Sequence, residues 1–105
     1  MARSVRLSDE ALLQIVGISD YISKDSQKNA QRWRTGLRSK IKSLQNLPTR
    51  HAILYTLEQA GREVRQTFYG TYRILYTIEK DTVTVLTVRH GAQRPIGPKE
   101  VDGIE

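Results

Sequence analysis

Hydrophobic residues recur at intervals of three and four over two stretches of the N-terminal half, and this spacing predicts two amphipathic helices. The first is expected over residues 9–23, with Ser8 as the N-cap that accepts a hydrogen bond from the first turn. The second begins after Asp25 or Ser26 and ends at Pro48, since proline disfavours the helical conformation in the residue before it. Each helix has an apolar stripe to bury, so we expect a helical hairpin packed on a sheet.

The strands of that sheet are predicted by alternating polar and apolar residues and by β-branched residues. Four are expected, at residues 3–7, 63–69, 72–79 and 82–90. Residues 52–57 form either a loop or a further short strand. The resulting order is β-α-α-β-β-β, in a chain short enough for one domain.

This domain is expected to span residues 1–94. The acidic residues 95–105 are expected to form a short flexible tail, because prolines and a glycine interrupt regular structure there.

The two-residue turn Lys80-Asp81 sets the expected register of the last hairpin, with Glu79 opposite Thr82. One face of the hairpin is then rich in bulky apolar groups and is assigned to the helices. That face carries Tyr72, Ile74, Tyr76, Ile78, Val83, Val85, Thr87 and Arg89. The other, open face carries Thr71, Arg73, Leu75, Thr77, Thr84, Leu86, Val88 and His90. Arg73 and His90 are then diagonal neighbours, within reach of one phosphate-sized group.

The position of Arg65 depends on the length of the preceding connection. A three-residue connection at 69–71 places Arg65 with Arg73 on the open face, whereas a two-residue connection turns Arg65 toward the helices. An unpaired arginine on the helix side would be costly, so we favour the first arrangement.

Charge is concentrated in one part of this basic chain, which has a net charge of +6 and an isoelectric point near 9.9. Residues 26–57 hold seven basic side chains and no acidic one. Five of them lie on the second helix, opposite its apolar stripe: Lys28, Arg32, Arg34, Arg38 and Lys42. Such a face binds nucleic-acid phosphates, binds an acidic protein partner, or is simply solvated.

Composition excludes several other classes of protein. The chain has no cysteine, which excludes disulfides and thiolate metal sites, and its two histidines argue against a zinc site. It has no apolar run of membrane-spanning length and no signal peptide, so we expect a cytoplasmic protein without membrane contact. Phosphate-binding loops and dinucleotide fingerprints are lacking too, and no cofactor is expected.

Two short segments carry a resemblance to a known family. Residues 72–76 read Tyr-Arg-Ile-Leu-Tyr, and residues 88–91 read Val-Arg-His-Gly. With the order of elements over about residues 3–94, they resemble the RelE/ParE family, the toxins of type II toxin–antitoxin modules once called plasmid stabilisation proteins. The resemblance implies a small curved antiparallel sheet of the α+β class, with the helical hairpin on one face. It also implies a cognate antitoxin that wraps the toxin in a hetero-oligomer.

The family has two kinds of target. RelE-like members cut mRNA on the ribosome without metal, which requires cations that hold the phosphate and groups that move protons. The resemblance then implies that Arg65 and Arg73 bind phosphate and that His90 moves a proton. It further implies contacts to nucleic acid or partner through Arg34, Arg38, Lys42 and Arg89.

ParE-like members instead poison DNA gyrase and need no nuclease residues. The sequence from His90 to Arg94, His-Gly-Ala-Gln-Arg, resembles ParE-type endings. We expect mRNA cleavage, with gyrase inhibition as the alternative. A third possibility is an inactive member or a plain nucleic-acid-binding module.

Overall fold

The computed structural model describes residues 3–46, 48–51, 53–57, 62–93, 97 and 104. The helices and strands are β1 (Ser4–Leu7), α1 (Asp9–Ser23), α2 (Gln27–Lys42), β2 (Ile53–Leu57), β3 (Arg62–Tyr69), β4 (Tyr72–Glu79) and β5 (Thr82–His90). Short 3-10 turns follow α2 at Ser43–Gln45 and Pro48–Arg50.

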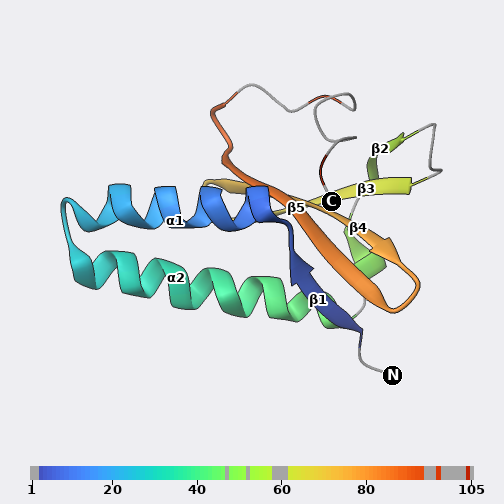
Figure 1. The fold of residues 1–105 in the computed structure, drawn as a ribbon, viewed down its shortest axis with the longest axis horizontal. Helices are drawn as coiled ribbons and strands as arrows, with labels where there is room; N and C mark the ends of the chain where they lie inside the picture. The colour runs from blue at the N-terminus through green and yellow to red at the C-terminus, as the bar shows by residue number, and fades with distance from the viewer. Residues whose placement is uncertain are drawn as a thin grey trace.

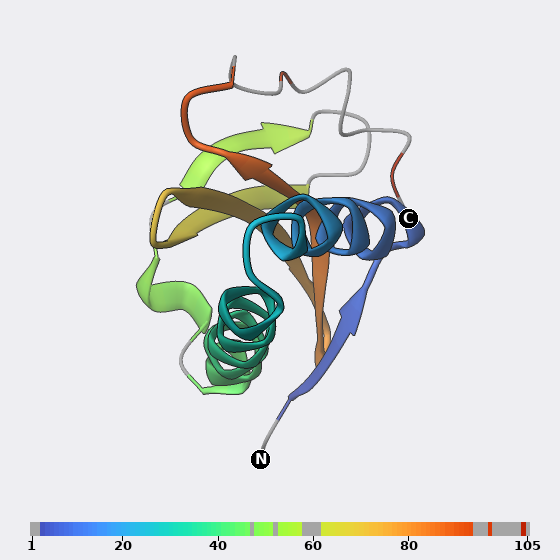
Figure 2. The ribbon, with the colours of Figure 1, turned by 90° about the vertical axis from the view of Figure 1, so that its left-hand side faces the viewer.

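The strands form one sheet in the order β1-β5-β4-β3-β2, and the hairpin of α1 and α2 lies along one of its faces (Figures 1 and 2). The predicted α+β class is confirmed. Residues 53–57 take the strand alternative and pair with β3, while Ala52 lies outside the described residues. The sheet is mixed, since β1 runs parallel to β5 and the other pairs are antiparallel.

The helix boundaries follow the predicted caps. α1 begins after Ser8, whose Oγ accepts a hydrogen bond from the Ala11 N–H at 3.0 Å and donates to the Leu86 carbonyl at 2.7 Å. Ser26 is the cap of α2. α2 ends at Lys42, earlier than predicted, because the chain tightens there into a 3-10 turn that still buries the apolar stripe.

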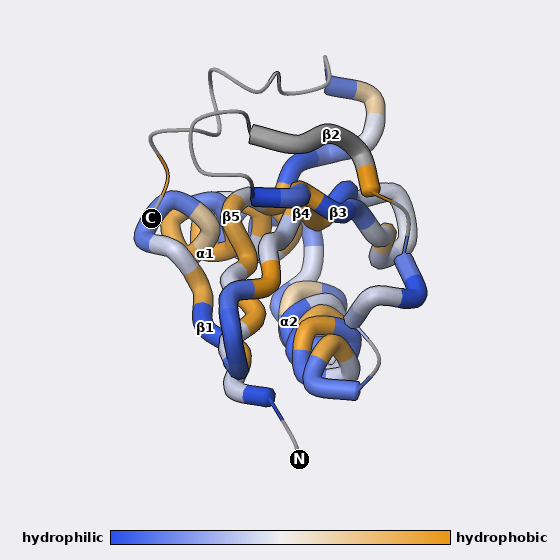
Figure 3. The backbone as a smooth tube through the Cα atoms, turned by 90° about the vertical axis from the view of Figure 1, so that its right-hand side faces the viewer, coloured by the Kyte–Doolittle hydropathy of each residue, from blue (hydrophilic) through white to orange (hydrophobic). Residues whose placement is uncertain are grey.

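The sheet face predicted to be open is not open, because Leu75, Thr77 and Thr84 on it are buried. The main core lies between the hairpin and the sheet face predicted to meet it. Its buried residues are Ala11, Leu37, Ile41, Leu44, Ile74, Tyr76, Val83, Val85 and Val88. Hydrophobic residues are frequent in the central strands and in both helices (Figure 3). The assignment of Ile74, Tyr76, Val83 and Val85 to the helix side is therefore confirmed.

The predicted register of β4 with β5 holds only for the first half of the hairpin. Pairing runs as predicted from Glu79 opposite Thr82 to Tyr76 opposite Val85, and a bulge then places Leu75 opposite Thr87. Beyond the bulge the residues of β5 exchange faces, while those of β4 keep theirs. The predicted placement of Thr87 and Arg89 on the helix side, and of Val88 and His90 on the open side, is therefore wrong.

The neighbour of the outer edge of β5 changes close to the bulge. β1 ends at Leu7, opposite Val85, and from there α1 runs along the edge of β5. Gln14 of α1 replaces the missing strand, because its Oε1 accepts hydrogen bonds from the Val88 N–H at 2.7 Å and the Thr87 hydroxyl at 2.9 Å.

Within the described ranges, no helix is long and apolar enough to cross a membrane. The tail predicted over residues 95–105 lies outside the described residues except for Gly97 and the buried Ile104, so it stays a prediction.

Candidate functional site

Helix α1 borders two grooves, one on each flank. The first groove lies between α1 and α2, has a volume of about 220 Å³, and has a largely apolar floor. Its lining residues are Leu7, Leu12, Ile15, Val16, Leu37 and Ile41, with Arg34 and Arg38 at the rim. Leu12 and Val16 are 46% and 56% exposed, so this apolar surface is accessible.

The charge of this groove, called here the α1–α2 groove, comes from α2. The Arg34 guanidinium donates a hydrogen bond to the Ser19 hydroxyl of α1 at 2.6 Å, and Arg38 lies one turn further along the same helix. Among the described residues that line the groove there is no acidic side chain. An amphipathic segment carrying carboxylates matches such an apolar floor with a cationic rim.

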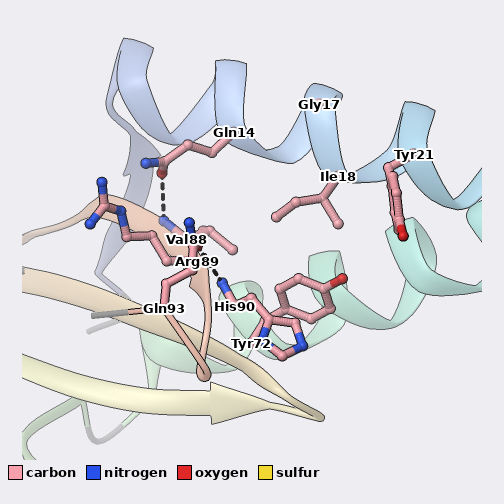
Figure 4. Close-up of a pocket in the computed structure, with 9 residues that line it drawn as sticks. All are labelled: Gln14, Gly17, Ile18, Tyr21, Tyr72, Val88, Arg89, His90 and Gln93. Atoms are coloured by element: carbon pink, nitrogen blue, oxygen red, sulfur yellow. Dashed lines mark hydrogen bonds between the residues drawn. The ribbon is translucent and has the colours of Figure 1, made fainter. Parts of the chain in front are cut away.

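The second groove, called here the α1–β5 groove, has a volume of about 330 Å³ and lies where β5 ends (Figure 4). It is lined by Gln14, Gly17, Ile18, Tyr21, Tyr72, Val88, Arg89, His90 and Gln93. The bulge explains the presence of His90 here, because it turns that side chain to the helix side of the sheet, where its ring meets Tyr72 edge-on at 5.4 Å.

Arg65 faces the helix side, contrary to the favoured arrangement. The connection is the two-residue one, with Tyr69 opposite Tyr72, and Arg65 consequently lies opposite Tyr76. The expected penalty does not arise, because the guanidinium donates to the carbonyls of Thr49 at 3.1 Å and His51 at 2.7 Å.

A cationic environment surrounds His51, next to Arg65. Its pKa is lowered from 6.5, first by burial and then by the positive charges of Lys40, Arg50 and Arg65. The imidazole is therefore neutral near pH 7.

Arg73 faces the opposite side of the sheet. Its guanidinium donates to the Gln66 amide oxygen at 3.0 Å and lies 5.4 Å from the centre of the Phe68 ring. Arg73 and His90, predicted to be neighbours on one face, thus lie on different faces.

The three predicted catalytic residues are therefore not brought together. Arg65 and His90 share a face, but they pair with Tyr76 and Tyr72, which are about 13 Å apart along β4 at about 3.3 Å per residue.

The residues predicted to contact a partner fall into separate places. Arg34 and Arg38 border the α1–α2 groove, and Lys42 is exposed in the last turn of α2. Arg89 lines the α1–β5 groove.

Sequence reasoning missed several residues of both grooves. α1 has more apolar residues than one buried stripe requires. This excess could have identified Leu12 and Val16 as exposed apolar residues of a binding surface. Gly17 and Tyr21 carry no comparable signal.

Comparisons with known proteins agree with the fold. A family model described as the ParE toxin of the type II toxin–antitoxin system parDE matches residues 5–95. A solved structure of a chromosomal ParDE toxin–antitoxin system from P. aeruginosa is similar, with a TM-score of 0.69 and 14% identity over 85% of this chain and 96% of that one. No curated protein matches the sequence.

Proposed function

Because this chain belongs to the ParE family of type II toxins, we propose that it is the growth-inhibiting toxin of such a module and acts in the cytoplasm by binding DNA gyrase. The observation that carries this choice of target is the separation of Arg65, Arg73 and His90 in the sheet. The resemblance to the RelE/ParE family implies either mRNA cleavage or gyrase inhibition. Gyrase inhibition requires only a binding surface.

Cleavage of RNA by its own 2′-hydroxyl needs a proton acceptor, a proton donor and a cation around one phosphate. These groups must lie within hydrogen-bonding distance of the reacting atoms. Arg65 donates to the chain's own carbonyls, and Arg73 lies on the opposite face from His90. The arrangement gives RelE-like chemistry by these three residues no support.

The cognate antitoxin is the second part of the proposal, and the α1–α2 groove is its docking site. The groove offers an apolar floor and two arginines, which complement an amphipathic, acidic segment. This site uses part of the basic surface of α2 that the sequence singled out.

The variant Arg73→Ala tests the choice between binding and cleavage. Its side chain lies on the sheet face opposite the helices and lines neither groove, so we expect growth inhibition within about threefold of the original protein. A nuclease that used Arg73 to stabilise charge on the phosphate would lose about 100-fold or more.

The measurement is growth arrest after induced expression, with and without the antitoxin, at matched protein levels. Thermal unfolding of the purified variant controls for its fold. A folded Arg73→Ala protein without toxicity would contradict the binding mechanism.

A further inference from the structure

We infer that the α1–β5 groove is the surface that holds the toxin's protein target, and that its occupant is an aromatic side chain next to an acidic residue. This inference rests on the proposed function, because it names the contact by which the toxin would bind gyrase. It is drawn from three features of the groove: its N–H donors that are unused by the described part of the chain, its aromatic walls and the space beside Gly17.

The hydrogen-bonding groups of the groove are biased toward donors. The Gln14 Oε1 accepts from β5, the Gln93 Oε1 accepts from the His90 N–H at 3.1 Å, and the His90 Nδ1 accepts from the Ala92 N–H at 3.0 Å. In neutral His90 the ring proton is then on Nε2. Each of these three side chains has its acceptor in use and retains an N–H donor with no hydrogen bond to another described residue.

The charged residues of the groove also favour an acceptor-rich ligand. The described lining includes no acidic side chain, and its one cationic residue, Arg89, contributes from β5 with its side chain on the sheet face that also carries Arg73. A ligand rich in acceptors, such as a carboxylate flanked by peptide carbonyls, would complement this set of donors.

The walls of the groove are aromatic. Tyr72 and His90 form one wall, and Tyr21, which is 71% exposed, stands on the α1 side (Figure 4). Trp33 packs edge-on behind Tyr72, with ring centres 5.2 Å apart, and supports that wall from the core. A rigid wall facing an exposed tyrosine favours the insertion of a planar side chain.

Gly17 lines the groove from α1 without a side chain. A Cβ added to Gly17 would have no other atom within 4 Å, apart from its own neighbours. With about 330 Å³, the groove is at the lower end of the roughly 300–1,000 Å³ range of ligand pockets. This size suits one anchoring side chain and part of its neighbour, as at the centre of a protein–protein interface.

The charge distribution favours a protein over a nucleic acid as the occupant. Protein surfaces that bind nucleic acid carry several cationic side chains, placed along the path of the phosphates. The described lining of the α1–β5 groove has one arginine, whereas Arg34 and Arg38 border the α1–α2 groove on the other flank of α1.

Filling the groove with Gly17→Leu tests the inference. The added side chain has room, so the fold should survive, and because Gly17 lines the groove we expect the leucine to compete with the inserted aromatic group. We expect at least tenfold weaker binding to purified DNA gyrase and antitoxin binding within about twofold of the original protein. The matched control is Thr35→Leu, which adds a similar side chain at an exposed position of α2 outside both grooves and should change neither.

Unchanged gyrase affinity of folded Gly17→Leu would overturn the groove assignment while leaving the proposed function intact. Equal losses in Gly17→Leu and Thr35→Leu would overturn it too. If nucleoside monophosphates shift the NMR signals of Tyr21 and His90 and fail to do so in Gly17→Leu, the occupant is a nucleic acid and the assignment to a protein is overturned. If the original protein itself neither binds gyrase nor inhibits it, the proposed function fails.

Discussion

Replacing both Arg34 and Arg38 by glutamate is expected to weaken antitoxin binding at least about 100-fold, and cells that express both proteins should then stop growing. These arginines border the α1–α2 groove, where we place the acidic, amphipathic segment of the antitoxin. A hydrogen bond to a charged group contributes about 1.5–3 kcal/mol, so two lost bonds and the new repulsion exceed the ~2.7 kcal/mol that correspond to 100-fold.

The control is a second double variant of α2 with the same change of net charge. Lys28→Glu/Arg32→Glu alters two exposed positions of α2 outside both grooves and should weaken binding by less than about tenfold, through long-range attraction alone. Isothermal titration of each purified toxin with the antitoxin gives both values. Equal losses in the two variants, or a full affinity of the Arg34/Arg38 variant, would exclude the groove as the docking site.

The substitution Gly36→Ala is expected to lower the free energy of unfolding by about 1–3 kcal/mol, although alanine normally stabilises a helix. Gly36 lies in α2 against Tyr69, and an added Cβ would lie 2.7 Å from the Tyr69 Cζ and closer still to its hydroxyl oxygen. The ring cannot retreat freely, because it packs near Trp33 with ring centres 6.5 Å apart. Thermal unfolding should show a fall in Tm of about 4 °C for each kcal/mol.

The other helical glycine provides the matched control. Gly17→Ala meets no neighbouring atom within 4 Å and should stabilise the protein by about 0.5–1 kcal/mol. In a Tyr69→Leu background, Gly36→Ala should lose most of its penalty, since the aromatic ring that it meets is gone. A stabilising Gly36→Ala in the original background would show that Tyr69 does not lie against the helix as described.

Local patterns in the sequence predicted most of the fold. The spacing of apolar residues, the serine before each helix and the β-branched runs gave α1, β4 and β5 with their observed bounds. The β4–β5 bulge was not predictable in this way, because no local pattern marks it and the contacts beside it are long-range, such as that of Gln14, which is more than 70 residues from Val88.

The candidate site was less predictable, for the same reason. Arg65 would belong on the open face only if the helix side offered it no partner, and the helix side does offer partners. The partners are the carboxylate of Glu63 at 3.4 Å and the backbone carbonyls of Thr49 and His51, and the conformation of the stretch that holds these carbonyls is revealed by no hydrophobic pattern. Arg73 and His90 are not neighbours as predicted, because the bulge turns His90 to the other face of the sheet.

The most direct test of the gyrase mechanism is DNA supercoiling by purified gyrase in the presence of the purified toxin, without ribosomes or RNA. We predict that the toxin inhibits supercoiling and leaves gyrase-dependent DNA breaks, and that addition of the antitoxin restores activity. Undiminished supercoiling at toxin concentrations that cut mRNA on translating ribosomes would contradict it.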